Sequence, residues 1–480
     1  MPTTRSQLKL LRPSNRMDRH GWIELRIAGS PAERGFQHGY WLAPELRGAL
    51  KSIRHLILMD TGVPFDWFAA NAAAMYLPVL QSNWEGKLAD QFGVEILEEL
   101  QGIVDGANAN RTTRGAKITL TDLLGWNGYP ELICQWWPAV QAGKVTPAVP
   151  LPSGALASAV AIPPRHHFHH SCSAFVACGE QTRDGDVVIA QTTWQRFANG
   201  DAYNIILDLK PERGERLLMQ SVPGYVYSST DFCVTGAQLG VAETSLNCNG
   251  FDPTALPEFL RMRRACQFAD SISAWCDLFK FGNNGGYVNT WLLADARKRS
   301  IAAYELTLQH DVLHPVLETG YYASCNIALS PAVRNLDCSG PSGFDNIQMS
   351  GGRRTRFEQL MRQHRGQLDP VLARAVLADH GDLYTREESP SSRTICGHFD
   401  VDQAQFPGVG QGPNYPWGSL DGKVAGGQMI RDLQLDARWG RACGTPFDAN
   451  AFFRENPQYE WMKGHTKSRP TQPWTTFPTE

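Results

Sequence analysis

The pattern of hydrophobic and polar positions changes its period part-way along the chain. In the first part, apolar residues recur at helical spacing over Leu46–Met59 and Trp84–Ile103. A short apolar run at Trp22–Ile27 instead predicts a β-strand. Residues 1–140 are therefore expected to form a helix-rich segment.

Residues 141–171 differ in composition from both neighbouring parts. Between Gln141 and Pro164 the chain consists mostly of Ala, Pro, Val, Gly and Ser, with five prolines and almost no charge. Proline has no amide hydrogen to donate within a helix or a central strand. The segment is expected to be an exposed linker.

Beyond the linker, short apolar runs separated by turn residues predict strands, and residues 172–480 are expected to form the second folded segment. The predicted strands form a β-meander that begins at Cys172; they are Ala174–Ala177, Val187–Thr192, Tyr203–Leu209 and Arg216–Gln220. Helical spacing returns at Leu256–Phe281, Arg353–His364 and Pro370–Asp379. The last stretch, rich in Pro, Trp, Lys and Thr, is expected to be an irregular tail. The pattern thus predicts a mixed α and β chain.

Composition narrows the classes of function. Of 480 residues, 42% are hydrophobic and 19% charged, which favours a globular protein with a large core. The 45 basic and 48 acidic residues leave a net charge of −3, so no nucleic-acid partner is expected. No apolar run has the length of a membrane span or of a signal peptide. We expect a soluble, cytoplasmic protein, although a chain that has already lost a signal peptide would look the same.

The cysteines and histidines give no metal signature. Eleven cysteines are scattered without a C-x-x-C pair, so reduced, buried thiols are expected rather than a disulfide scaffold or a zinc ribbon. Four histidines, His166, His167, His169 and His170, crowd the end of the linker. Because no Asp, Glu or Cys ligand stands at a fixed spacing from them, no metal and no cofactor are predicted. The cluster is interpreted as solvated linker, or as a proton-transfer aid through His170.

Cys172 has the sequence context of an N-terminal nucleophile. It begins a predicted strand directly after the linker. Scission of the Ser171–Cys172 bond would free an α-amine with a pKa of about 7.7 to 8.0, able to act as base for a thiol with a pKa of about 8.5. The alternative is that Cys172 is one more buried thiol at a strand edge.

Seven short motifs follow one another along the chain: HSCSAFVA (170–177), QTTW (191–194), SVPGYVYSSTDF (221–232), GVAETS (240–245), NNGGYVNTWLLAD (283–295), YYASCN (321–326) and SGGRRTRF (350–357). In their order and approximate spacing they resemble the phospholipase B-like proteins, distant relatives of penicillin acyltransferase and bile-salt hydrolase. The resemblance extends from Trp22 to about Ile430.

The resemblance implies an α+β fold, the four-layer αββα sandwich of N-terminal-nucleophile hydrolases. It also implies that Cys172 is the nucleophile, exposed by self-cleavage after Ser171. Where the family's strand motif begins with histidine this chain has Gln191, which cannot transfer a proton, so the α-amine is favoured as the base.

Further site residues follow from the matching motifs. Asn326 corresponds to an oxyanion donor, and Arg353 to an arginine that positions the α-amine or lowers the thiol pKa. Alternatives are that Asn326 caps a turn, that Arg353 is a solvated helix charge and that the tryptophans are ordinary core. The residues expected to line the substrate site are Thr193, Trp194, Glu243, Asn289 and Trp291.

The resemblance predicts a hydrolase that cleaves an amide or ester bond of a small acyl substrate through a thioester. Acyl transfer to an amine is the alternative reaction. A catalytically silent relative that binds lipid or a protein partner is the alternative function, motivated by Gln191. The sequence leaves substrate identity and any homo-oligomer open.

Overall fold

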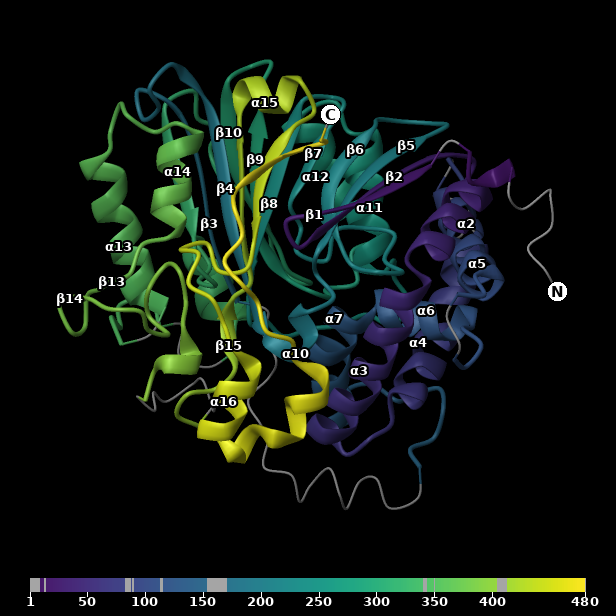
Figure 1. The fold of residues 1–480 in the computed structure, drawn as a ribbon. Helices are drawn as coiled ribbons and strands as arrows, with labels where there is room; N and C mark the ends of the chain where they lie inside the picture. The colour runs from purple at the N-terminus through teal and green to yellow at the C-terminus, as the bar shows by residue number, and fades with distance from the viewer. Residues whose placement is uncertain are drawn as a thin grey trace.

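The structure is a computed structural model that describes residues 9–12, 14–82, 88, 90–112, 115–152, 171–339, 343–348, 350–403 and 412–479. Two large β-sheets occupy the middle of the molecule, with helices around them (Figure 1). The chain is therefore α+β, as predicted.

The nine-stranded sheet has the order β1-β2-β5-β6-β7-β8-β9-β10-β11. Its strands are β1 (Asn15–Arg19), β2 (Trp22–Gly29), β5 (Ile205–Pro211), β6 (Leu217–Ser221), β7 (Cys233–Thr235), β8 (Leu239–Ser245), β9 (Asn289–Asp295), β10 (Ser300–Leu306) and β11 (Asp311–Leu313). β2 and β5 are parallel, whereas the other neighbours are antiparallel. The predicted strand at Trp22–Ile27 thus joins a sheet built mainly by the second segment.

The seven-stranded sheet has the order β12-β3-β4-β16-β17-β18, and β15 pairs with β4 beside β16. Its strands are β12 (Gly320–Ser324), β3 (Ser171–Gly179), β4 (Gly185–Arg196), β15 (Trp417–Ser419), β16 (Asp421–Gly426), β17 (Leu435–Trp439) and β18 (Thr475–Phe477). β13 (Gly381–Asp382) and β14 (Glu387–Glu388) form a separate hairpin.

Alternate residues of β3 point to opposite faces of its sheet. Ala174 and Val176 belong to the large core that also contains residues of the nine-stranded sheet. Phe175 and Ala177 instead belong to a second core, shared with α13 (Ser350–Gln363) and α14 (Pro370–Leu377). The seven-stranded sheet therefore packs against the other sheet on one face and against helices on the other.

The first segment supplies helices α2 (Pro31–Trp41), α3 (Ala43–Thr61), α4 (Phe65–Gln81), α5 (Phe92–Ala109), α6 (Leu120–Asn127), α7 (Tyr129–Glu131) and α8 (Trp137–Gln141), with a π-helical turn at Leu132–Trp136. α2 and α5 approach closely because they meet at glycines: a Cβ on Gly39 would lie 2.0 Å from the carbonyl oxygen of Ile103. The helix expected at Trp84–Ile103 corresponds to α5 in its later part, while its first residues, 84–87, lie outside the described residues. Gln91 adopts a left-handed conformation (φ 55°), so α5 begins at Phe92.

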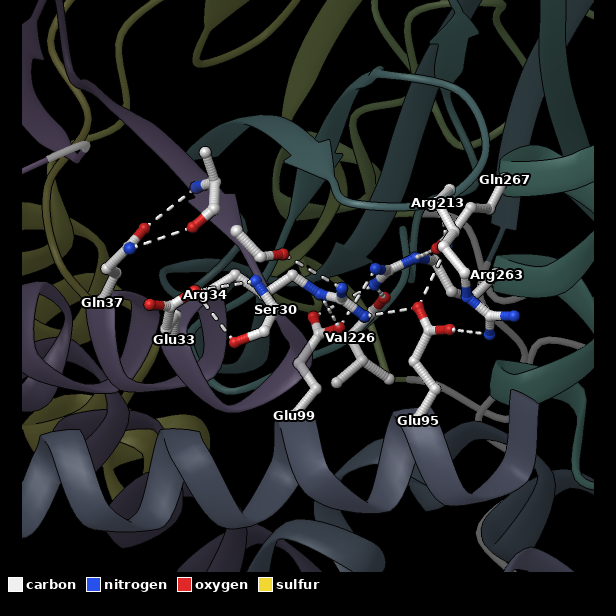
Figure 2. A network of polar contacts seen from close by, with 12 residues as sticks. Ser30, Glu33, Arg34, Gln37, Glu95, Glu99, Arg213, Val226, Arg263 and Gln267 are labelled. Carbon is white, nitrogen blue, oxygen red and sulfur yellow. Dashed lines mark hydrogen bonds and ion pairs between the residues drawn. The ribbon is translucent and has the colours of Figure 1, made fainter. Parts of the chain in front are cut away.

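A buried ion-pair network joins the two segments across the linker (Figure 2). Arg34 of α2 donates to Glu95 and Glu99 of α5 at 2.8 and 2.6 Å. From the second segment, Arg263 of α11 (Glu258–Phe268) lies 3.1 Å from Glu99, and Arg213 lies 2.6 Å from Glu95. Charges this deeply buried are costly to separate from their partners, so the network holds the segments together.

Two other expectations were wrong in part. The β-meander ends after β4, because the chain leaves the seven-stranded sheet and β5 joins the other sheet beside β2. The helix expected at Leu256–Phe281 is two helices, α11 and α12 (Ile272–Lys280), since Ala269 is extended and Ser271 caps the second helix.

The tail is more regular than expected. It contains α16 (Ala449–Glu455), a 3₁₀ helix (Pro457–His465) and β18. The remaining short elements lie earlier in the chain: α10 (Phe197–Gly200), a π-helical turn (Val333–Asp337), a 3₁₀ turn (Phe399–Val401) and α15 (Gly427–Arg431). All eleven cysteines are free thiols, as expected, and nine are buried. Among the described residues, no helix is both long and apolar enough to cross a membrane.

Candidate functional site

Cys172 lies near the start of β3, on the face that looks toward the nine-stranded sheet. It pairs with Thr193 of β4, and Gln191, two residues earlier on β4, pairs with Lys423 of β16. Directly opposed residues share a face of the sheet, so these four side chains project to the same side. The Cys172 side chain is buried, with 1% of the residue exposed.

Both backbone polar atoms of Cys172 are bound by predicted site residues. The Cys172 N–H donates to Asn326 Oδ1 at 3.0 Å. Arg353 donates through Nη1 to the Cys172 carbonyl oxygen at 2.6 Å and through Nη2 to Asn326 Oδ1 at 3.1 Å. The three residues therefore form a closed ring of hydrogen bonds around the start of β3.

The contacts of Asn326 fix the orientation of its side-chain amide. Its Oδ1 accepts from two donors, while its Nδ2 donates to the carbonyl oxygen of Ser245 at 2.9 Å. Exchanging the two atoms would set an amino group against two donors, so the assignment is determined by the surroundings. Asn326 also has a left-handed backbone (φ 67°), which is rare outside glycine and concentrated at functional sites.

Arg353 is a buried residue and not the solvated helix charge considered as its alternative; 3% of it is exposed. Its guanidinium lies 4.1 Å from the centre of the Trp194 ring, an arrangement that stabilises a buried cation. The neighbouring Arg354 and Arg356 instead bind Glu358 and Asp379. Arg353 is thus the arginine of SGGRRTRF that reaches Cys172.

Burial and two neighbouring charged groups shift the pKa of the Cys172 thiol in opposite directions. Burial raises its pKa well above the usual value, and the Glu243 carboxylate raises it further, whereas the Lys423 ammonium lowers it. Cys172 Sγ donates to Glu243 Oε1 at 3.7 Å. Burial also raises the pKa of Glu243 to about 8, against the lowering effect of Lys423 and of the Cys172 contact. A carboxyl whose pKa is raised is a stronger base when ionised than an ordinary carboxylate, which suits Glu243 to accept the thiol proton.

Two buried acceptor atoms beside Cys172, Glu243 Oε2 and Gln191 Oε1, lack a hydrogen-bond partner among the described residues. Gln191 uses its amino group to bind the carbonyl oxygens of Thr230 and Glu243 at 2.9 and 2.7 Å. Buried acceptors are normally satisfied, so their clustering beside a thiol favours a site that receives water or a polar group of a substrate.

Trp291 has the surroundings of a core aromatic residue. Its ring lies 5.0 Å from that of Trp275 and 4.8 Å from that of Phe279, both on α12. The same strand, β9, carries Asn289, whose amino group binds the Tyr287 carbonyl oxygen at 3.0 Å. The predicted lining residues therefore differ: Thr193, Trp194 and Glu243 contact Cys172 or its bound partners, whereas Trp291 packs against α12.

One cavity of about 670 Å³ is lined by residues of β1, α3 and the tail, among them Asp18, Lys51 and His465. Cys172 is not among its lining residues. The linker histidines His166, His167, His169 and His170 lie outside the described residues. Among the residues that the structure describes, the one group of side chains able to hold a metal ion is formed by His380, Cys396, His398 and Cys443, and it does not include Cys172.

The sequence profile of the Phospholipase B family matches residues 66–473. The chain belongs to the phospholipase B family. It is 31% identical over 324 residues to the Caenorhabditis elegans protein named "Putative phospholipase B-like 2", covering 60% of this chain and 53% of that one. It is 24% identical over 238 residues to "Phospholipase B" of Crotalus adamanteus, covering 44% and 40%.

An uncharacterized Archaeoglobus fulgidus protein is 23% identical over 296 residues, covering 61% of this chain and 44% of that one. The chain thus spans about half the length of the curated relatives it matches.

Two residues of the site were missed by sequence reasoning. Lys423 and Asp421 form a fully buried ion pair at 3.2 Å. Lys423 also donates to Oγ1 of Thr193 at 2.6 Å, and Thr193 is the residue that pairs with Cys172. The available signal was the sequence DGKVAG, in which two charges stand in an otherwise uncharged strand. Charges in a buried strand are rare without a partner or a function.

Proposed function

We propose that this chain is a cysteine hydrolase of the N-terminal-nucleophile type, which cuts its own Ser171–Cys172 bond and then hydrolyses an amide or ester bond of an acyl substrate. The observation that carries the proposal is the binding of both backbone polar atoms of the buried Cys172, its N–H by Asn326 and its carbonyl by Arg353. Backbone polar groups of a strand are usually bound by the neighbouring strand, so their binding by two side chains from distant segments favours a residue whose nitrogen is positioned to become the catalytic base.

In the self-cleavage step, Cys172 Sγ attacks the carbonyl carbon of Ser171 while its proton passes to Glu243, 3.7 Å away. The resulting oxyanion collapses, the bond from the Ser171 carbon to the Cys172 nitrogen breaks, and that nitrogen takes up a proton. The product is a thioester between Ser171 and Cys172. Water then hydrolyses it to a Ser171 carboxylate and a free thiol.

In the turnover step, the new α-amine of Cys172 accepts the thiol proton as Sγ attacks the substrate carbonyl. The amine or alcohol of the substrate leaves with a proton, and water hydrolyses the acyl thioester to the free acid. Gln191 cannot act as the base, which fits an amine in that role. The hydrogen bonds of Asn326 Oδ1 to the Cys172 nitrogen and of Arg353 to its carbonyl oxygen support a role of both residues in orienting the amine.

We assign oxyanion stabilisation to Asn326 Nδ2, which in the intact chain donates to Ser245. For this role Nδ2 must either leave Ser245 and donate to the oxyanion, or keep that contact with one hydrogen and donate its other hydrogen to the oxyanion. The Lys423 ammonium offsets part of the rise in the thiol pKa that burial and Glu243 cause. Thr193, Trp194, Glu243 and Asn289 are proposed to bind the substrate, with Thr193 fixed by Lys423 and Trp194 by Arg353, whereas Trp291 is assigned to the core beneath α12.

The proposal includes the αββα sandwich. Its support is that the two faces of the seven-stranded sheet belong to separate cores, one shared with the nine-stranded sheet and one with α13 and α14. α12 packs on the nine-stranded sheet through Phe279 and Trp275, which contact Trp291 of β9.

We propose a small acyl substrate, either a linear amide or an acyl lipid. The relative from Crotalus adamanteus is named as a phospholipase, which favours an ester. The unpaired Gln191 Oε1 and the unpaired Oε2 of the Glu243 carboxyl favour a substrate that carries polar groups near the reacting bond. Both descriptions fit a polar head attached to an apolar acyl chain.

An acyl probe that reacts with thiols, followed by mass spectrometry, tests the proposal. Cleaved wild-type protein should carry the label on the terminal Cys172, and Cys276→Ser, which changes a buried thiol of α12, should be labelled equally. A screen of amides, lysophospholipids and N-acyl amino acids, with and without an added amine acceptor, then distinguishes hydrolysis from acyl transfer. A Cys172 thiol that stays unlabelled in cleaved protein would identify a catalytically silent relative.

A further inference from the structure

Two cysteines and two histidines converge at the side of the seven-stranded sheet that α13 and α14 cover. His380 directly precedes β13, Cys396 and His398 follow the β13–β14 hairpin, and Cys443 lies in the turn after β17. One ligand atom from each of the four residues lies within 4.8 Å of all the others. Cys396 and His398 are buried, and the other two are partly buried.

The separations match those of a tetrahedral zinc site. With Zn–N of about 2.05 Å and Zn–S of about 2.3 Å, tetrahedral geometry requires about 3.3 Å between two nitrogens and about 3.6 Å between nitrogen and sulfur. The Nε2 atoms of His380 and His398 are 3.1 Å apart. His398 Nε2 is 3.5 Å from Cys396 Sγ and 3.5 Å from Cys443 Sγ.

We infer that His380, Cys396, His398 and Cys443 form a structural zinc site. A set of two thiolates and two imidazoles in tetrahedral arrangement selects Zn²⁺ among the common divalent ions. Two thiolates also balance the charge of the ion, so no further anion is required. All four positions are occupied by protein ligands, which is typical of a structural zinc and not of a catalytic one.

The backbone around the four ligands is held in place by hydrogen bonds, as expected of a preformed site. The Cys396 N–H donates to the Asp379 carbonyl at 3.1 Å, which ties the first two ligand segments together. The His398 N–H donates to the Ser391 carbonyl at 2.9 Å. The Thr445 N–H donates to Cys443 Sγ at 3.4 Å, a contact that stabilises a metal-bound thiolate.

The site also supports one wall of the Cys172 region. Gly397, between two of the ligands, lies so close to Trp194 that a Cβ there would be 2.5 Å from the ring. Phe399, next to His398, packs edge-on against the same ring at 5.8 Å. Because Trp194 in turn stacks on Arg353, zinc would fix the loop that holds this pair.

The ligands are dispersed over three chain segments, so no local sequence motif indicates them. Their spacing contains a single short C-x-H step, with the other ligands 16 residues before it and 45 after it (396 − 380 and 443 − 398). This proposal replaces the sequence-based expectation that the chain holds no metal.

The test measures zinc in the untagged full-length chain, purified without chelator. Wild-type protein should contain one zinc per chain, and Cys443→Ser and Cys396→Ser should contain less than a tenth of that. Cys276→Ser, and a variant with His166, His167, His169 and His170 all replaced by Gln, should keep the full amount. Zinc retained by the two ligand variants, or lost from the linker variant alone, would overturn the assignment.

A second measurement covers the case in which the ligand variants fail to fold. Wild-type protein is stripped with a chelator and titrated with Co²⁺, which should saturate at one ion per chain and give the visible absorption of a tetrahedral thiolate complex. Chelation should also lower the melting temperature, and zinc should restore it. Folded wild-type protein that takes up no Co²⁺, or whose Cys396 and Cys443 are joined by a disulfide, would contradict the proposal.

Discussion

The ion-pair network around Glu99 and the surroundings of Cys172 are both buried and both charged, but their polar atoms are paired to different degrees. In the network, Arg34 and Arg263 bind Glu99, Glu95 binds Arg34, and none of these side chains has an unpaired buried atom. Around Cys172, Glu243 Oε2 is among the acceptors without a partner in the described part of the chain.

The difference in pairing corresponds to a difference in protonation. Burial alone raises the pKa of Glu99, but the ion pairs with Arg263 and Arg34 together outweigh it and lower the pKa, so this carboxylate is charged in the folded protein. Burial raises the pKa of Glu243 to about 8, and the Lys423 ammonium, which lowers this pKa, offsets only part of the effect of burial. A fully paired buried charge stabilises a fold, whereas an incompletely paired one is available for chemistry.

The largest expected effect is on Glu243. If Glu243 accepts the thiol proton during self-cleavage, as proposed, Glu243→Gln should slow cleavage by about 10²- to 10⁴-fold. The free energy of unfolding should not fall at neutral pH, since a carboxyl with a raised pKa is mostly uncharged there and an amide has the same shape. Cleavage of freshly translated precursor, followed on denaturing gels, gives the rate.

The pH dependence sharpens the same prediction. Glu243 must be ionised to accept a proton, and with a pKa of about 8 roughly a tenth of it is ionised at pH 7. Wild-type cleavage should therefore accelerate about tenfold per pH unit up to pH 8 and level off above it. In Glu243→Gln this dependence should disappear. A wild-type rate that is constant between pH 6 and 8 would exclude Glu243 as the acceptor.

Glu99→Gln should have the opposite pair of effects. It leaves Arg34 and Arg263 buried with weaker pairing, which costs about 3–5 kcal/mol in the free energy of unfolding. Once folded, the variant should cleave at the wild-type rate. Asp66→Asn is the matched control: its partner Arg54 is exposed, and loss of that pair should cost less than about 1 kcal/mol in urea unfolding. Equal costs for the two variants would remove the basis of the comparison.

Replacing Asn326 by alanine should lower kcat by about 10²- to 10³-fold, because an oxyanion donor is lost. Asn326→Asp separates its two roles, because aspartate keeps the acceptor for the Cys172 nitrogen but loses the Nδ2 donor. If oxyanion stabilisation is the main role, both variants lose activity alike on the cleaved enzyme. An Asn326→Ala variant that folds and keeps near-wild-type turnover would show that neither role is needed.

Local patterns predicted the parts of the fold that depend on neighbouring residues. The strand at Trp22–Ile27 and the helix at Leu46–Met59 appear as β2 and α3, because their apolar faces match a period of two or of 3.6. The exchange between sheets after β4 was not predictable in this way. It depends on the parallel pairing of β5 with β2, about 180 residues earlier in the chain.

In the candidate site, too, residues in short contiguous motifs were predicted, whereas residues brought together only by strand pairing were missed. Cys172, Asn326 and Arg353 stand in short contiguous motifs, and the structure joins them by hydrogen bonds. Lys423 was missed because its relation to Cys172 exists only through the pairing of β16, β4 and β3. The contact of Gly397 with Trp194 likewise joins residues far apart in the sequence.

The central claim is that Cys172 becomes the first residue of a new chain. Cleavage after Ser171 should give pieces of roughly 19 and 34 kDa, in proportion to 171 and 309 residues, that copurify through contacts such as the Glu99 network and separate on denaturation. Terminal sequencing of the larger piece is the most direct test. The account predicts that it begins at Cys172 and that Cys172→Ala stays a single inactive chain. A wild-type chain that remains intact yet is fully active, or cleavage that persists unchanged in Cys172→Ala, would contradict it.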